Sequence, residues 1–141
     1  MSARDPFHAR ISDSFARQTI MATLRADLLE VSPGRVVITA PLLPGFRQQH
    51  GAGHAAITFA LGDSAAGYAA LTLIPEDREV MTVEMKINLL APALGQRLMA
   101  TGEVIRPGRR LLIVRASVLA QRDGTEIPVA EMLGTMIPVD A

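Results

Sequence analysis

The segment from residue 48 to residue 63 combines two features that could do chemistry, a helix start and a carboxylate. The helix would begin after His54, and Asp63 lies inside it among apolar and small residues. A carboxylate in apolar surroundings costs free energy unless it is paired or used. The first N–H groups of a helix have no partner within it, so they can polarise a carbonyl oxygen. A base and an oxyanion site in one segment are the components of an acyl-transfer enzyme.

Asp63 is the strongest catalytic candidate. Its carboxylate could act as a general base toward water or as a nucleophile on a carbonyl carbon, and the sequence leaves both roles open. The alternative is a surface carboxylate that pairs with an arginine. The neighbours at 60–62 and 65–67 are alanine, leucine and glycine, which leave little polar surface for such a pair. This composition favours a functional carboxylate.

Four further side chains have both a chemical and a structural interpretation. His54 could donate to a carbonyl oxygen or cap the helix, and Gln48 could orient water or be an exposed loop amide. Thr82 could hydrogen-bond Asp63 or water, or be an ordinary strand threonine. His50 is interpreted as part of the loop structure. His50 and His54 have the i, i+4 spacing of a metal pair, but no third ligand lies nearby in the sequence, so no metal is expected.

Three arginines, Arg106, Arg109 and Arg110, cluster at a predicted turn. They could hold the phosphates of a small ligand, and the alternative for each is a solvated turn residue. The chain has 14 basic and 14 acidic residues, so its formal net charge is zero. Without a basic excess to neutralise phosphates, nucleic acid is not expected as a partner.

Length and composition favour one domain over residues 1–141. The chain has no cysteine, which excludes disulfides, thiolate metal sites and a cysteine nucleophile. The first residues are charged and do not resemble a signal peptide. Asp63, Glu76 and Glu84 interrupt the apolar runs before they reach membrane-spanning length. We therefore expect a cytoplasmic protein with no membrane contact.

The elements that must position these residues follow from hydrophobic periodicity. From residue 51 to residue 70, 12 of the 20 residues are alanine or glycine. This segment predicts a helix over Gly53–Leu73 that is apolar nearly all round and therefore buried. Apolar and polar residues then alternate over Thr82–Leu89, which predicts a strand with one buried face.

The remaining segments complete an α+β fold. The predicted order is a helix, a β-hairpin, the buried helix and a four-strand meander, with the sheet wrapped around the buried helix. The amphipathic helix is expected over about 6–18, and the other strands near Met21–Val31, 36–39, 97–105, 111–121 and 128–139.

The motif at the helix start has a specific spacing. Gln48, Gly51 and His54 are followed by Ala55-Ala56 and, after six further residues, by Asp63. This motif resembles the pattern Asn-x-x-Gly-x-x-His-Gly-Gly, then six residues, then Asp or Glu. That pattern belongs to hotdog-fold acyl-CoA thioesterases of the phenylacetic-acid-degradation and 4-hydroxybenzoyl-CoA thioesterase type.

Two downstream segments carry the same resemblance. Residues 82–87 are similar to the strand that follows the central helix, and residues 90–95 to the turn after it, so the resemblance covers roughly residues 15–138. Two departures stand out. Gln48 replaces Asn, which shifts the amide group that would position water. Ala55-Ala56 replaces Gly-Gly, which keeps the backbone N–H groups but leaves less room for a substrate to approach them.

The resemblance implies a hotdog fold that hydrolyses an aryl- or medium-chain acyl-CoA to free acid and CoA, with no cofactor. It implies that the backbone N–H of Ala55 points at the thioester oxygen. It also implies catalytic roles for Asp63 and for side chains around it. The substrate-contacting residues would be Gly51, Ala56, Arg106, Arg109 and Arg110.

The spacing of Ala55 and Asp63 constrains any joint role. Eight residues separate them on one helix, which is roughly 12 Å along its axis. They cannot act on the same carbonyl within one chain. A two-fold partner with an antiparallel copy of the helix would bring Asp63 of one chain opposite Ala55 of the other. If both act, the protein is at least a dimer with shared sites, and many relatives in the resembling family pair dimers into tetramers.

Two other functions remain open on the same fold, because a fold does not fix a function. A non-catalytic acyl-CoA sensor or carrier is favoured by the change of Gly-Gly to Ala55-Ala56. A hydratase would need an Asp/His pair in a different placement, because His54 and Asp63 would lie on opposite faces of their helix. Retention of Asp63 in an apolar helix favours the thioesterase.

Overall fold

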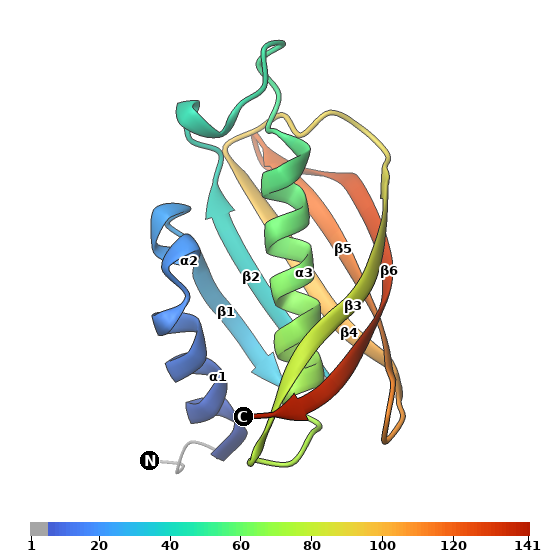
Figure 1. The fold of residues 1–141 in the computed structure, drawn as a ribbon. Coiled ribbons are helices and arrows are strands. Elements are labelled where there is room, and N and C mark those ends of the chain that lie inside the picture. Colours follow the sequence, from blue (N-terminus) through green and yellow to red (C-terminus); the bar gives the residue numbers. More distant parts are fainter. Residues whose placement is uncertain (1–5) are drawn as a thin grey trace.

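A computed structural model describes residues 6–141 and shows a curved sheet around one long helix (Figure 1). The helical elements are α1 (Pro6–Arg17), α2 (Thr19–Thr23), the short 3-10 helix η1 (Pro44–Phe46) and α3 (Ala55–Leu71). The strands are β1 (Asp27–Ser32), β2 (Arg35–Pro41), β3 (Arg78–Leu89), β4 (Arg97–Pro107), β5 (Leu112–Arg122) and β6 (Thr125–Asp140). No helix within residues 6–141 is both long and apolar enough to cross a membrane.

Helix α3 lies in the concave face of the sheet, as its composition predicts. The six strands are antiparallel in the order β1-β2-β4-β5-β6-β3. Leu61, Ala65 and Ala66 of α3 are fully buried. A Cβ atom at Gly102 of β4 would overlap the backbone of Ala65 and Ala66, so the strand and the helix meet backbone to backbone. The small residues of α3 permit this approach, and the expected wrapping of an antiparallel sheet around the helix is confirmed.

The predicted strand near Met21–Val31 is wrong in its first half. Residues 19–23 form α2, and the strand begins at Asp27. Met21 and Leu24 are three residues apart and both almost fully buried, which is helical spacing. Arg25 then reverses the chain with a φ of +53°. Because short apolar runs fit either period, local sequence did not separate the two elements.

The predicted four-strand meander is also wrong in part. Strands β4, β5 and β6 form consecutive hairpins, but β3 pairs with β6 and not with β4. The connection over residues 90–96 instead crosses the N-terminal end of α3, where Ala93 forms an isolated bridge with Gly53. The loop before α3 is thus held against the loop after β3.

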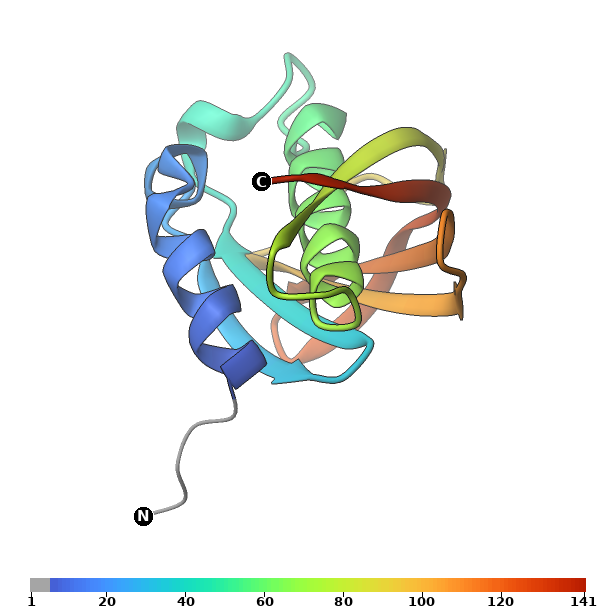
Figure 2. The ribbon, with the colours of Figure 1, turned by 60° about the horizontal axis from the view of Figure 1, so that its bottom comes forward.

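The N-terminal helix covers one edge of the sheet. Helix α1 matches its predicted range and lies beside β1 (Figure 2), with Ile11 fully buried. The guanidinium of Arg10 donates to the carbonyls of Leu71, Ile74 and Pro75 at 3.4, 3.3 and 3.2 Å, and also to that of Arg78. The first three carbonyls lie at and just beyond the C-terminus of α3, where no helical donor remains for them, and that of Arg78 lies at the start of β3. At the other edge of the sheet, β3 has no covering element within residues 6–141.

Candidate active site

The start of α3 presents one free backbone N–H. His54 is the N-cap residue, and its Nδ1 accepts a hydrogen bond from the N–H of Ala56 at 2.9 Å. The N–H of Ile57 donates to the carbonyl of His54 at 2.9 Å. Within residues 6–141 the N–H of Ala55 has no hydrogen-bond partner. The cap therefore leaves the Ala55 N–H available and fixes the proton of a neutral His54 on Nε2.

The side chain of Gln48, in the loop before α3, is hydrogen-bonded within the loop itself. The side-chain oxygen of Gln48 accepts from the backbone N–H of His50 at 2.5 Å. The N–H of Gln48 donates to Ala52 at 2.8 Å, and Gly51 has a φ of +88°, a conformation that glycine adopts without strain. The amide oxygen of Gln48 thus shapes the loop, and its amide nitrogen is the group left to face a ligand.

A cavity of about 540 Å³, named here the loop cavity, opens beside this helix start. It lies between the loop before α3 and the segment that follows β3. Its lining includes Gln48, His54 and Ala55 on one side and Leu89, Leu90 and Pro92 on the other. Leu89 and Leu90 are 57% and 55% exposed, so this wall of the cavity is apolar and open to a ligand.

Asp63 lies on the third turn of α3 and is partly buried. The hydroxyl of Thr82 on β3 donates to its Oδ1 at 2.8 Å, which is one of the two partnerships predicted for Thr82. Burial raises the pKa of Asp63 above its usual range, and the hydrogen bond from Thr82 acts in the opposite direction. Such a carboxylate is a better proton acceptor than a solvated one, as a general base requires.

Asp63 faces a second cavity of about 250 Å³, named here the α1 cavity. Its walls come from α1, α3 and β3, and its lining residues are Ser14, Gln18, Asp63, Ser64, Gly67, Tyr68, Leu71, Glu79, Val80 and Thr82. Ala55 lines the loop cavity and Asp63 lines the α1 cavity. A single chain therefore carries the two groups in separate cavities, in keeping with their separation along α3.

The α1 cavity also contains a polar cluster that sequence reasoning missed. Gln18 donates to the hydroxyl of Tyr68 at 2.9 Å and accepts from Ser64 at 3.1 Å, and Ser14 donates to Tyr68 at 3.3 Å. Ser14 and Gln18 are four residues apart and share the inward side of the N-terminal segment. Two polar residues at core positions of an amphipathic helix were the available signal.

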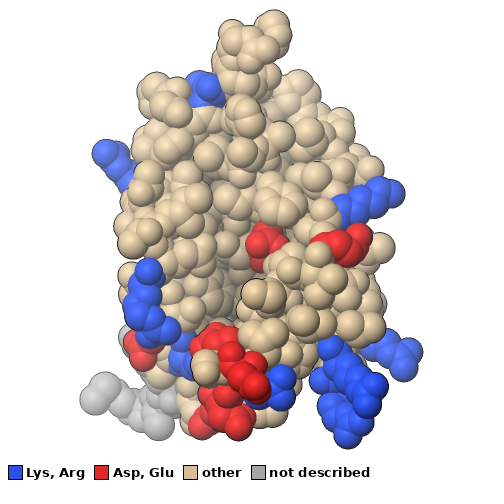
Figure 3. Space-filling model, in the orientation of Figure 1, with Lys and Arg blue, Asp and Glu red and all other residues tan. Residues whose placement is uncertain are grey.

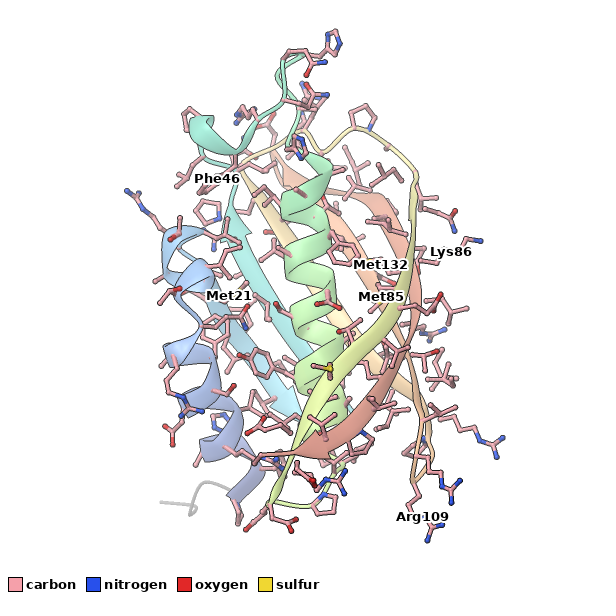
Figure 4. The ribbon with its side chains drawn as sticks, viewed as in Figure 1. Met21, Phe46, Met85, Lys86, Arg109 and Met132 are labelled. Carbon is pink, nitrogen blue, oxygen red and sulfur yellow. The ribbon has the colours of Figure 1, made fainter. Side chains whose placement is uncertain are left out.

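The three arginines lie far from the loop cavity of their own chain. Arg106, Arg109 and Arg110 are exposed at the turn between β4 and β5. Figure 3 shows that charged side chains on this face gather toward one end of the molecule. Figure 4 places Arg109 at the end opposite Phe46, which belongs to the loop before α3. The structure does not bring these arginines together with Gln48, His54 and Ala55 in one protomer.

Known proteins resemble this chain in sequence and fold. The model of the Thioesterase superfamily matches residues 50–127, which is more than half of the chain. A thioesterase family protein from Silicibacter pomeroyi is 43% identical, with a TM-score of 0.94 over 96% of this chain and 99% of that one. A candidate esterase of Saccharolobus solfataricus is 30% identical over 78% of each chain. The PaaI protein from the phenylacetic acid degradation operon of E. coli is 18% identical, with a TM-score of 0.86 over 96% of this chain and 94% of that one.

An antiparallel sheet around one long helix is the hotdog fold, and the matches to thioesterases show that the protein is a thioester hydrolase. The chain belongs to the Thioesterase superfamily. The resemblance seen in the sequence is confirmed, both for the family and for the fold.

Proposed function

We propose that the protein hydrolyses acyl-CoA thioesters, with Asp63 as the general base or nucleophile. The observation that carries this proposal is the hydrogen bond from the hydroxyl of Thr82 to the carboxylate of Asp63, at 2.8 Å. This partly buried carboxylate lines a cavity that can admit a substrate. No basic side chain lines this cavity among the described residues, so no ion pair with Asp63 competes for its charge. A carboxylate kept at such a cost in free energy is expected to have a chemical role.

The oxyanion donor in this proposal is the backbone N–H of Ala55. Negative charge develops on the thioester oxygen during attack at the carbonyl, and a free N–H at a helix start stabilises that charge. The Nε2–H of His54 is a second donor available at the same rim, because the cap occupies only Nδ1. The Gln48 amide nitrogen is placed to orient water or the substrate from the loop.

We further propose that each site is shared between two copies of the chain. The loop cavity holds Gln48, His54 and Ala55, and the α1 cavity holds Asp63 and Thr82. An antiparallel copy of α3 would bring the two sets together. Strand β3 is the free edge of the sheet, and Met81 and Val83 on it are each 57% exposed. A long edge strand with exposed apolar side chains favours pairing with a second copy.

The assembly also gives the arginine turn a role. Antiparallel helices would place the β4–β5 turn of one protomer at the same end as the loop cavity of its partner. Coenzyme A is large and its phosphates must remain near solvent, so its pantetheine arm would occupy the larger loop cavity. We propose that Arg106, Arg109 and Arg110 then meet the phosphates of a CoA bound by the partner.

A non-catalytic acyl-CoA sensor is the second candidate, favoured by one observation. The methyl group of Ala55 stands where the family pattern has no side chain, next to the N–H that would bind the substrate. Within one chain, His54 and Asp63 do not form the Asp/His pair that a hydratase would need, because His54 lines the loop cavity and Asp63 the α1 cavity.

One experiment separates these functions. Purified protein is incubated with a panel of aryl- and medium-chain acyl-CoAs, and free thiol is measured with a chromogenic disulfide. Thiol release supports the thioesterase. Binding in calorimetry without thiol release would support the sensor and overturn the proposal, and hydration of an enoyl-CoA without thiol release would support the hydratase.

A further inference from the structure

Strand β3 does not alternate regularly along its whole length. Val80 and Thr82 point inward before its middle, and Met85 points inward after it. Val83 and Glu84, which lie between them, are both exposed, Val83 to 57%. In a regular strand successive side chains point to opposite faces, so two neighbours do not both point outward. One residue of β3 is therefore additional to the regular alternation.

The pairing of β3 with β6 identifies this additional residue as Val83. Positions 82 and 84 of β3 pair with the consecutive positions 136 and 135 of β6, so Val83 is an extra residue between them. This is a β-bulge, which inserts one residue into one strand of an antiparallel pair. The alternation in the sequence would otherwise place Val83 and Met85 inward and turn Thr82 away from α3. The bulge thus lets Thr82 reach Asp63 while Met85 stays against the core.

Gly134 of β6 provides the space that β3 occupies beside the bulge. It pairs with Met85, and a Cβ atom on it would lie 2.6 Å from the carbonyl oxygen of Glu84 and 2.7 Å from Sδ of Met85. The thioether could turn aside, but a backbone oxygen cannot move without moving its strand. An alanine at position 134 would therefore push β3 outward at Glu84, two residues after Thr82.

We propose that Gly134 is a positioning residue of the reaction, because it makes room for the bulge at Val83 that directs the Thr82 hydroxyl to Asp63. This inference rests on the proposed function, in which Asp63 is the reacting group. Gly134 is not among the described residues that line the two cavities, so it acts only through the strand that carries Thr82. Residue 134 also lies outside the segment 50–127 that the family model matches.

The pKa of Asp63 can report on this arrangement. Burial raises that pKa, and the hydrogen bond from Thr82 lowers it, so loss of the bond should raise it further. The other titratable groups that line the α1 cavity are Glu79 of β3 and Tyr68 of α3, and the α1 residue that lines it is Ser14, which does not titrate. A substitution at position 134 removes none of these groups.

The first experiment measures the pH dependence of kcat/KM for hexanoyl-CoA and benzoyl-CoA. Gly134→Ala should move the acid limb to higher pH, in the same direction as Thr82→Val. In the double variant the limb should stay where Thr82→Val places it, because the hydroxyl that Gly134 positions is already absent. Val36→Ala is the matched control for a general loss of stability. Val36 is fully buried in β2, and β4, β5 and β6 separate it from β3, so its truncation should leave the limb in place.

The second experiment deletes Val83. In a regular strand the loss of one residue would turn Thr82 to the outer face and move the limb as Thr82→Val does. If Val83 is the extra residue, the deletion leaves positions 82 and 84 paired as before, and the limb should remain at its wild-type pH. The shortened strand should also accept Gly134→Ala without a shift of the limb, because the bulge no longer needs the space.

Three results would overturn the inference while the proposed function survives. The first is a Gly134→Ala variant whose acid limb does not move, including one that loses activity equally at every pH. The second is a shift that adds to that of Thr82→Val. The third is a deletion of Val83 that unfolds the protein or behaves like Thr82→Val, and this experiment decides alone if Gly134→Ala does not fold.

If no acyl-CoA releases thiol, the proposed function fails and the geometry is tested without turnover. Carbon NMR titration of the Asp63 carboxyl group then replaces the activity profile. Its pKa should rise in Gly134→Ala and in Thr82→Val, and should keep its wild-type value in Val36→Ala and after deletion of Val83. An unchanged pKa in Gly134→Ala would overturn the inference in this case as well.

Discussion

The hydroxyl of Thr82 donates a hydrogen bond to the carboxylate of Asp63 over 2.8 Å, and this bond joins β3 to the middle of α3. The carboxylate is partly buried, and this burial is the larger influence on its pKa. The hydrogen bond therefore fixes the orientation of Asp63 and partly offsets the rise in its pKa. It also ties the proposed catalytic group to the strand that forms the free edge of the sheet.

Replacement of Asp63 by asparagine should abolish hydrolysis and leave the fold and the assembly intact. The amide has nearly the same shape but cannot accept a proton from water or attack a carbonyl. A general base contributes about 100- to 10,000-fold in rate, and a loss of at least this size is expected. Thiol release and size-exclusion chromatography measure the two outcomes. Full activity in a well-folded Asp63→Asn variant would show that the catalytic assignment is wrong.

The same substitution should change how stability depends on pH. Because burial raises the pKa of Asp63, the folded protein keeps a proton that the unfolded chain has already lost. The stability linked to this site is fully present below the unfolded pKa and is lost as pH rises through the folded pKa. Chemical denaturation of Asp63→Asn should lack this decline. An unchanged pH profile would argue against a raised pKa at this position.

Thr82→Val should move the acid limb of the activity profile to higher pH. The hydroxyl lowers the pKa of Asp63, so its removal raises that pKa and leaves less of the ionised base at a given pH. Thr82→Ser keeps the hydroxyl and is the matched control. The pH dependence of kcat/KM reports the shift. An acid limb that stays in place in Thr82→Val would exclude Asp63 as the group that titrates in the reaction.

Ala55→Pro removes the proposed oxyanion donor without disturbing the helix. Proline is well tolerated at the first helical position, and His54 already has the extended backbone (φ −63°, ψ 138°) that a residue before proline prefers. We expect kcat to fall by about 100-fold or more. Ala55→Ser, which keeps the N–H, should remain active. Equal activity in Ala55→Pro would remove the oxyanion role.

A mixture of two inactive variants tests whether the site is shared. A heterodimer of Ala55→Pro and Asp63→Asn chains would contain one doubly damaged site and one intact site. Unfolding the two proteins together and refolding them should restore about a quarter of wild-type activity if the chains pair at random across a two-fold axis. No recovery in a mixture that forms dimers would place both groups of a site in one chain.

His54→Asn separates capping from catalysis. Asparagine is a good N-cap residue, so stability should be kept, whereas His54→Ala should cost about 1 kcal/mol. Asparagine cannot reproduce the Nε2–H of His54, so activity should fall in both variants if that group binds the thioester oxygen. Denaturant titration and thiol release measure the two effects. Wild-type activity in His54→Asn would assign this residue to the cap alone.

Local patterns in the sequence predicted the elements but not all of their neighbours. The strand alternation after Thr82 and the small residues of α3 carry enough information to define a buried helix in an antiparallel sheet. The pairing of β3 with β6 depends on a crossing between distant segments, held by the Gly53–Ala93 bridge, and no short-range signal encodes it. Short-range signals also did not predict that α2 is a helix and not a strand, because this depends on the burial of Met21 and Leu24 against the rest of the core.

The candidate site divides in the same way. Asp63 could be predicted because its neighbours along the helix are all apolar or small, so the sequence alone shows an isolated carboxylate. The polar cluster could not, because Ser14 and Gln18 belong to the N-terminal segment and Ser64 and Tyr68 to α3, about fifty residues away in sequence. Each of them alone is an ordinary polar residue, and only the packing of α1 on α3 makes them a cluster.

The contact between Gly102 and the backbone of Ala65 and Ala66 bears on how this protein could change in evolution. A helix separated from its sheet by side chains can shift when those side chains change, but two backbones in contact act as a fixed stop. The depth at which α3 lies in the sheet, and with it the position of Asp63, should therefore change little when side chains elsewhere in the core are substituted. Changes in α1 and in the loops can alter the shape of the cavities while the proposed reacting groups stay where they are.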